Sequence, residues 1–406
     1  MHTLSPARVR LALLSLALGG FGIGATEFVA MGLLPTLAED LVPQLYATNP
    51  EEALAQAGWL ISAYALGVVV GAPTIAAMSA RFPRKQLLLV LVGTIVVATI
   101  ASALLPSFGL VLLARFVSGL PHGAYFGIAS LVAASLMGPG QRGRGIAFVL
   151  SGLTIANVIG VPAITALGHV AGWRVAYGAV AAIFALTFVA IALFVPLQPG
   201  DPAATLKREL AGFARGQVWL ALATGAVGFG GFFAVYTYVS PLVTDVALLS
   251  IEVVPLALVV LGLGMTLGNL LGGRLADHHV MRTVFGFFAV FLVSLLVVAL
   301  FGENPVALFV GLFLVGASAS ALSPAIQTRL MDVAGESQTL AAAANHSSLN
   351  IGNSMGAALG GVVIAAGLGY LSVAWVGVVL GVAGVIVAAV SVLLQRRTAG
   401  RTTERV

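Results

Sequence analysis

The stretch LALLSLALGGFGIGATEFVAMGLLPTL, Leu11 to Leu37, decides the class of fold. It is almost wholly apolar, and its one charged side chain is Glu27. A helix needs about 20 apolar residues to cross a bilayer. The stretch therefore predicts a membrane-spanning helix, and it raises the question of why a carboxylate lies inside one.

The composition of the whole chain points the same way. Of its 406 residues, 60% are hydrophobic and only 8% are charged, whereas a soluble domain carries about 25% charged residues. The chain cannot cover itself with a water-compatible surface, so we expect an integral membrane protein. The absence of cysteine excludes disulfides and thiolate metal sites. The first apolar run is too long for a signal-peptide core, and we expect it to be retained.

Long apolar runs recur along the chain, and we predict twelve membrane-spanning helices from them, all joined by short linkers. The predicted spans are 11–37, 55–78, 86–105, 108–136, 145–168, 173–196, 217–245, 253–275, 283–302, 305–331, 338–366 and 371–395.

Basic residues mark every second linker. Apart from Arg115 and Arg174, all of the 19 Lys and Arg residues lie in the N-terminal segment, in or directly beside alternate linkers, or in the C-terminal tail. The intervening linkers carry acidic residues instead. The positive-inside rule then predicts that both termini are cytoplasmic in a bacterial-type inner (plasma) membrane.

The chain divides into two similar parts. We expect an N-terminal six-helix bundle at 1–196, a cytoplasmic linker with an amphipathic helix at 197–216, a C-terminal bundle at 217–395 and a basic tail at 396–406. A shift of 197 residues places Gly67 and Gly71 on Gly264 and Gly268. A shift of 196 places Asn157 on Asn353. Such pseudo-repeats, related by an axis along the membrane normal, are typical of one large transporter architecture.

The linker GGRLADHHVMR, Gly272 to Arg282, joins the eighth and ninth predicted spans. It resembles the cytoplasmic signature of the major facilitator superfamily, a glycine followed by Leu-Ala-Asp and basic residues. The matching first-half linker, AAMSARFPRK, keeps only the basic part and has Ala80 in place of the acid. The resemblance implies an all-α major facilitator fold and a role for these linkers in closing the cytoplasmic side. The residues concerned are Arg81, Arg84, Lys85, Asp277 and Arg282.

Two further motifs indicate one branch of that family. The fourth span, LLARFVSGLPHGAYFG, is similar to the proton-antiporter motif in which an arginine, here Arg115, precedes two glycines. The fifth, SGLTIANVIGVPAITALG, resembles the antiporter motif of glycines around a proline, with Gly160 and Pro162 matching and Val161 inserted between them. Together with TEFVAMGLLP, these stretches resemble the drug:proton antiporter branch, which includes arabinose-efflux-permease-like, purine-nucleoside and chloramphenicol exporters. The resemblance implies a monomer.

The carboxylate of Glu27 has one obvious candidate partner. Glu27 lies about eight residues from the outer end of its span and Arg115 about seven residues from the outer end of its own, so both lie at a depth of roughly 11 Å. A buried charge is costly in a membrane unless it is paired or neutralised. Two interpretations stay open. Glu27 and Arg115 form a structural ion pair, or Glu27 exchanges a proton for the exported molecule.

Other polar and aromatic side chains follow helical spacing. His122 shares a face with Arg115 and is either a titrating group or a neutral hydrogen-bonded one. His346, Asn350 and Asn353 form one stripe, Asn157 lies in the fifth span, and Phe229, Phe233 and Tyr236 form an aromatic stripe. Pockets for small molecules combine such aromatic and amide groups. The aromatic stripe alone is also compatible with a lipid-facing or packing surface.

Taken together, the sequence predicts a secondary transporter that exchanges protons for a small neutral or monocationic molecule and binds it through Glu27 and these stripes. Alternatives are a sugar or nucleoside exporter and, in another class, a transport-inactive sensor on the same fold. No phosphate-binding loop, metal cluster or enzyme motif is found, so we expect neither a cofactor nor an enzymatic activity. The basic linkers suit the membrane surface and not a nucleic acid.

Overall fold

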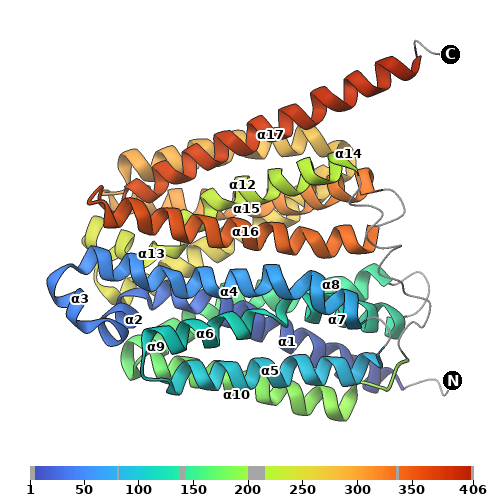
Figure 1. The fold of residues 1–406 in the computed structure, drawn as a ribbon, viewed down its shortest axis with the longest axis horizontal. Helices are drawn as coiled ribbons and strands as arrows, with labels where there is room; N and C mark the ends of the chain where they lie inside the picture. Colours follow the sequence, from blue (N-terminus) through green and yellow to red (C-terminus); the bar gives the residue numbers. More distant parts are fainter. Residues whose placement is uncertain (1–4, 80–81, 138–141, 200–214, 335–337, 404–406) are drawn as a thin grey trace.

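The computed structural model is built from long helices and describes residues 5–79, 82–137, 142–199, 215–334 and 338–403 (Figure 1). Within these residues, 12 helices are long and apolar enough to cross a membrane, as the sequence predicts. The predicted linker helix falls almost entirely in 200–214, outside the described residues.

The helices form two bundles that lie against each other, one below and one above in Figure 1. The first contains α1 (Pro6–Gly32), α2 (Leu34–Leu41), α3 (Pro43–Thr48), α4 (Pro50–Ser79), α5 (Arg84–Leu104), α6 (Phe108–Gly119), α7 (His122–Met137), α8 (Arg142–Ile155), the π-helix η1 (Ala156–Gly160), α9 (Val161–Ala171) and α10 (Trp173–Phe194). The second contains α12 (Gly216–Thr237), α13 (Val239–Pro241), η3 (Leu242–Val246), η4 (Ile251–Val253), α14 (Val254–Phe301), α15 (Pro305–Ala334), α16 (Gln338–Ala365) and α17 (Ser372–Thr403). We call them the N-half and the C-half.

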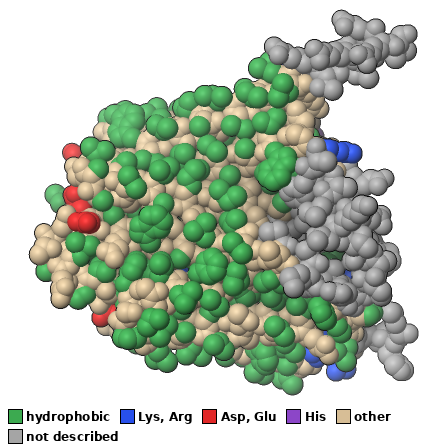
Figure 2. Space-filling model, in the orientation of Figure 1, with side chains coloured by type: hydrophobic (Ala, Val, Ile, Leu, Met, Phe, Trp, Pro, Cys, Tyr) green, Lys and Arg blue, Asp and Glu red, His purple; other side chains and the backbone are tan. Residues whose placement is uncertain are grey.

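The two ends of the molecule carry opposite charge. Acidic side chains lie at the end formed by α2, α3 and the start of α4, and basic side chains lie at the opposite end, where both termini emerge (Figures 1 and 2). We call these the acidic end and the basic end. On the face shown in Figure 2, hydrophobic side chains cover much of the surface between the two ends, as expected for a surface that contacts lipid chains.

The internal repeat is confirmed at the level of individual contacts. Gly67 and Gly71 of α4 face the carbonyl oxygens of Phe116 and Leu120, so a side chain at either glycine would collide with backbone. In the C-half, Gly264 and Gly268 of α14 face the carbonyl oxygens of Phe313 and Ala317 in the same way. All of these positions are related by the shift of 197 residues. Each pair of helices packs closely because glycine lets two backbones approach.

Several predicted boundaries differ from the structure by about five residues or more, and three of the differences have a clear local cause. The first span ends at Gly32, and not at residue 37, because the short helix α2 starts a new direction at Leu34 with Pro35 in its first turn. The seventh ends at Thr237 and not at 245, and α13 and η3 follow it. In place of the expected linker between the eighth and ninth spans, the structure has one non-helical residue, His279 (φ −149°, ψ 83°), within α14.

Prolines explain two interruptions inside spans. The span from Phe108 to Met137 changes from α6 to α7 at Leu120 and Pro121. The span from Phe148 to Ala171 contains the π-helix Ala156–Gly160 directly before Pro162. Proline has no N–H to continue the helical ladder, so the register changes beside it. Single π-turns inside helices are frequent at functional sites, and this one contains Asn157.

Candidate functional site

Glu27 lies on α1 at the contact between the two halves. Glu27 is only 5% exposed, and its Oε1 accepts a hydrogen bond of 3.3 Å from Nδ2 of Asn353 on α16. This bond joins residues 326 positions apart and crosses from the N-half to the C-half. Any movement that separates α1 from α16 therefore breaks a hydrogen bond to the carboxylate.

Arg115 on α6 is buried beside α1 but does not pair with Glu27. Its guanidinium donates to the carbonyl oxygen of Thr26 at 3.0 Å and to the Thr26 hydroxyl at 3.2 Å. It lies 4.5 Å from the ring centre of Tyr64 and 5.6 Å from that of Tyr177. A direct ion pair between Glu27 and Arg115, one of the two interpretations that the sequence left open, is therefore absent between these two residues. The planar cation is stabilised by two aromatic faces and by dipoles of α1 instead of by a carboxylate.

Several polar atoms around these two residues have no hydrogen-bond partner among the described residues. They are Nε and one Nη of Arg115 and the side-chain oxygens of Asn157, Asn350 and Asn353. An unsatisfied buried polar group costs about 1–3 kcal/mol. Such groups are rare in proteins and call for an explanation. Among these atoms, those of Arg115 and Asn353 lie beside Glu27 or its immediate neighbour, so a polar ligand bound there can satisfy them.

His122 and His346 approach the same phenylalanine from the two halves. His122 is buried, and its Nδ1 lies 3.1 Å from the hydroxyl of Tyr64. The ring of Phe126 lies 5.5 Å from that of His122 and stacks on that of His346 at 5.9 Å. Tyr64 therefore contacts both Arg115 and His122, and a continuous row of side chains leads from the arginine to the C-half.

The aromatic stripe of α12 points toward α1. Phe229, Phe233 and Tyr236 are 7%, 5% and 1% exposed, so the lipid-facing interpretation is wrong. The ring of Phe28 lies 6.4 Å from that of Phe233 and 5.2 Å from that of Tyr236, with interplanar angles of 5° and 11°. Phe28 directly follows Glu27, so the aromatic group and the carboxylate lie next to each other.

The fifth span lies on the opposite side of the same region. Asn157 is 3% exposed within the π-helix, and its carbonyl oxygen contacts Gly262 of α14 in the C-half. Gly160 faces the ring of Phe21 on α1, and Pro162 is buried in the first turn of α9. The π-helix thus lies where the N-half meets both its own α1 and the C-half.

The predicted gating residues lie apart from this region, at the basic end. Arg84 donates to the side-chain oxygen of Gln198 at 3.5 Å, and Lys85 donates to the carbonyl oxygen of Ala192 at 2.8 Å. Both therefore contact the end of α10 within the N-half. Arg282 is exposed. Arg81 and the side chain of Asp277 lie outside the described part of the structure.

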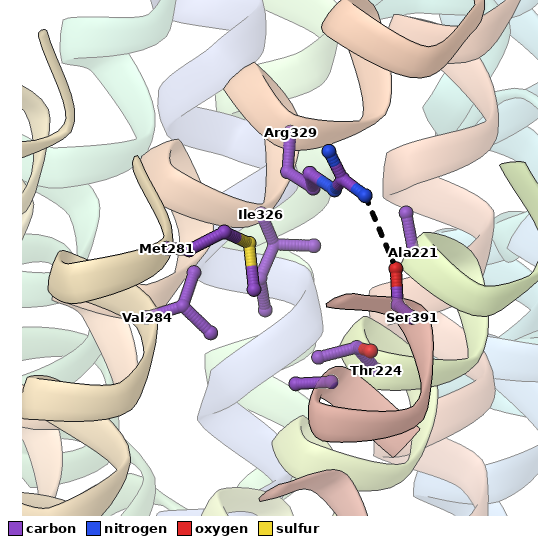
Figure 3. A pocket seen from close by; sticks show the side chains of 8 residues that line it. Ala221, Thr224, Met281, Val284, Ile326, Arg329 and Ser391 are labelled. Carbon is purple, nitrogen blue, oxygen red and sulfur yellow. Dashed lines mark hydrogen bonds between the residues drawn. The ribbon is translucent and has the colours of Figure 1, made fainter. Parts of the chain in front are cut away.

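A further buried cation lies in the C-half near the basic end. Arg329 on α15 donates to the side-chain oxygens of Gln217, Ser391 and Gln395 at 3.1, 3.2 and 2.7 Å. It lines a small hollow between α12, α14, α15 and α17, whose other walls are mostly apolar (Figure 3). These bonds tie three helices of one half together, and none of them reaches the other half.

Sequence reasoning found the carboxylate, the arginine, both histidines and the three asparagines, and it missed Thr26, Phe28, Tyr64 and Tyr177. Thr26 and Phe28 are the sequence neighbours of Glu27, so their place beside the carboxylate could have been inferred from the sequence. Tyr64 and Tyr177 are isolated aromatic residues in apolar runs, and no spacing within their own helices distinguishes them.

The geometry defines a membrane transport protein whose two repeated halves enclose a polar and aromatic centre. The family model described as Major Facilitator Superfamily matches residues 16–253 and 244–405, and the chain belongs to that family of secondary transporters. The family assignment made from the motifs is confirmed.

The chain is similar to several named proteins of this family. It is 37% identical to "Inner membrane transport protein YdhP" of Escherichia coli (strain K12) over 399 residues, 98% of each chain. It is 33% identical to "Chloramphenicol resistance protein" of Streptomyces lividans, over 89% of this chain and 90% of that one. The crystal structure of the human organic anion transporter MFSD10 (TETRAN) has the same fold, with a TM-score of 0.67, 17% identity and 95% and 100% coverage.

Proposed function

We propose that this protein exports a small neutral or monocationic aromatic molecule, similar in chemistry to chloramphenicol, in exchange for protons. The observation that carries the proposal is the hydrogen bond between Glu27 and Asn353. It joins a buried carboxylate of one half to an amide of the other. A group that binds a proton at the contact between two moving halves can couple protonation to their movement.

The chemistry of Glu27 suits this task. As a carboxylate, Glu27 accepts the Asn353 N–H and carries a charge that needs compensation inside a membrane. When protonated it is neutral and can itself donate a hydrogen bond. Arg115 lies next to it without forming an ion pair, so no cationic partner has to be displaced from the carboxylate before the proton arrives. We propose that Arg115 and His122 form the charged and polar surroundings of this exchange.

The side chains around Glu27 support a particular kind of substrate. Phe229, Phe233 and Tyr236 offer aromatic surface, and His346 and the unpaired amide oxygens of Asn157, Asn350 and Asn353 offer acceptors for O–H and N–H groups. An aromatic molecule with hydroxyl or amide donors satisfies both. The similarity to a chloramphenicol resistance protein supports the same class.

The distribution of charge supports an orientation. We propose that the basic end faces the cytoplasm of a bacterium and the acidic end faces outward across the inner membrane, as the positive-inside rule predicts. The similarity to an inner membrane transport protein supports this location. In this orientation Arg81, Arg84, Lys85, Asp277 and Arg282 lie on the cytoplasmic side, where we propose that they act in closing it.

The test is substrate uptake into inside-out vesicles that contain the protein. An imposed pH gradient, acid inside, should drive uptake of radiolabelled chloramphenicol, and a protonophore should abolish it. Pentoses and purine nucleosides are tested in parallel. Uptake of one of these instead would move the substrate class to sugars or nucleosides. Uptake that persists with the protonophore would contradict proton coupling.

A further inference from the structure

Tyr238 is a fully buried tyrosine at the junction of α12 and α13, near the acidic end. Its hydroxyl donates a hydrogen bond of 2.8 Å to the carbonyl oxygen of Ala357 on α16. Both residues belong to the C-half. The phenol is therefore held in place by its own half, whatever the N-half does.

Glycines surround this phenol on both sides of the contact between the halves. In the C-half, a methyl group added at Gly360 would come within 2.6 Å of the ring carbon Cε2, and one at Gly361 within 2.8 Å of the hydroxyl oxygen. In the N-half, a methyl group added at Gly58 of α4 would come within 2.5 Å of the same oxygen. The hydroxyl of Tyr238 thus fits against α4 only because position 58 has no side chain.

Neighbouring contacts show that the halves are closed at this place. Ser62, one turn further along α4, donates to the carbonyl oxygen of Ser354 on α16 at 3.2 Å. A methyl group at Gly361 would also come within 3.2 Å of the carbonyl oxygen of Ala55. These residues occupy the first turns of α4 and the last turns of α16, so the contact covers the polar centre from the acidic end.

We propose that Tyr238 is a positioning residue that closes the acidic end, with its hydroxyl as a knob and Gly58 as the matching hole. The inference rests on the transport cycle of the family and not on the identity of the substrate. When α4 moves away from α16, the knob leaves the hole but keeps its hydrogen bond to Ala357. Opening therefore breaks packing without leaving a buried hydroxyl unpaired, which suits a contact that has to form and open in every cycle.

The chain contains no cysteine, so a single introduced thiol can report on closure without a substrate. The background is Ser62→Cys, whose thiol lies between the knob and the polar centre. Labelling by a membrane-impermeant maleimide is measured from each face of the membrane in proteoliposomes. Gly58→Ala forces a methyl group against the hydroxyl. Overpacking of this kind should raise the rate of labelling from the acidic face by about tenfold.

The decisive result is a rescue. Tyr238→Phe removes the oxygen with which the new methyl group collides, so Gly58→Ala combined with Tyr238→Phe should return labelling to the level of the background protein. Gly360→Ala is the matched control, because its clash is with a ring carbon that Tyr238→Phe keeps. Tyr238→Phe should therefore not rescue Gly360→Ala.

Two results would overturn the proposal. One is labelling from the acidic face that Gly58→Ala leaves unchanged. The other is a defect in Gly58→Ala that Tyr238→Phe does not relieve, which would make position 58 a matter of helix packing alone. If Gly58→Ala does not fold, Tyr238→Leu removes the knob and should raise labelling from the acidic face by itself. Unchanged labelling in that variant would also reject the proposal.

Discussion

The N-half and the C-half share a plan of helices but differ in the side chains that they bury at the centre. The N-half contributes a carboxylate, a guanidinium and an imidazole, in Glu27, Arg115 and His122. The C-half contributes the amides of Asn350 and Asn353 and the rings of Phe233 and Tyr236. The two halves therefore share one arrangement of helices but bury different groups at the centre. The carboxylate and the guanidinium come from the N-half, whereas amides, imidazoles and aromatic rings come from both halves.

The asparagines at 157 and 353 illustrate this difference at a single repeated position. Both are buried and related by the shift of 196 residues. The amide nitrogen of Asn353 donates to Glu27 of the opposite half, and the side-chain oxygens of both asparagines have no hydrogen-bond partner among the described residues. The repeated amide thus meets a carboxylate at position 353.

The largest expected effect is that of a substitution at Arg115 in the N-half. Arg115→Lys keeps the charge but loses the planar contact with Tyr64 and the fork of donors to Thr26. We expect the free energy of unfolding to fall by roughly 2 kcal/mol and net transport to fall more than about tenfold. Thermal denaturation and vesicle uptake measure the two effects.

Arg174 supplies the control for Arg115. It forms an ion pair of 2.8 Å with Asp40 near the acidic end, with side chains 38% and 46% exposed. Exposed pairs contribute up to about 1 kcal/mol, so Arg174→Lys should leave transport nearly unchanged. Equal losses in the two variants would contradict a special role for the arginine at the centre.

The repeated asparagines give the next effect in size. Asn353→Ala removes a hydrogen bond to a charged group, which contributes about 1.5–3 kcal/mol, and we expect proton flux to fall by about tenfold. Asn157→Ala should raise the KM for substrate and leave the number of protons per substrate unchanged. Simultaneous recording of both fluxes separates the outcomes. A change of stoichiometry in Asn157→Ala would contradict the assignment of proton coupling to Asn353 and of substrate binding to Asn157.

The smallest effect is expected at the aromatic contact. Phe28→Leu removes the stacking on Phe233 and Tyr236, and aromatic pairs contribute about 0.5–1.5 kcal/mol beyond burial. The KM for an aromatic substrate should rise about threefold to tenfold, while the KM for a non-aromatic competitor should not change. Phe288 on α14 is fully buried, so Phe288→Leu should lower stability without changing the KM for aromatic substrates selectively. If Phe288→Leu changes the KM in the same way, the stacking of Phe28 contributes to helix packing and not to substrate recognition.

The sequence was sufficient for the helices, the repeat and the proximity of Glu27 and Arg115, because each depends on hydrophobic length or on spacing along one helix. Glu27 and Arg115 were predicted at equal depth, and the structure brings Arg115 to the neighbouring Thr26. Depth along a helix does not fix rotation about its axis, so the direct ion pair could not be decided from spacing. Tyr64 and Tyr177 were missed for the same reason. They reach Arg115 from other helices, and only the packing of α4 against α6 and of α10 against α1 places them there.

The most direct test of the central claim is proton movement in liposomes that contain the purified protein and a pH-sensitive dye. The substrate found by vesicle uptake is added to the wild type, to Glu27→Gln and to Glu303→Gln, which changes an exposed carboxylate. We predict substrate-evoked proton flux in the wild type and in Glu303→Gln, and none in Glu27→Gln. Flux of normal size in Glu27→Gln would contradict the account and leave Glu27 as a structural contact between the two halves.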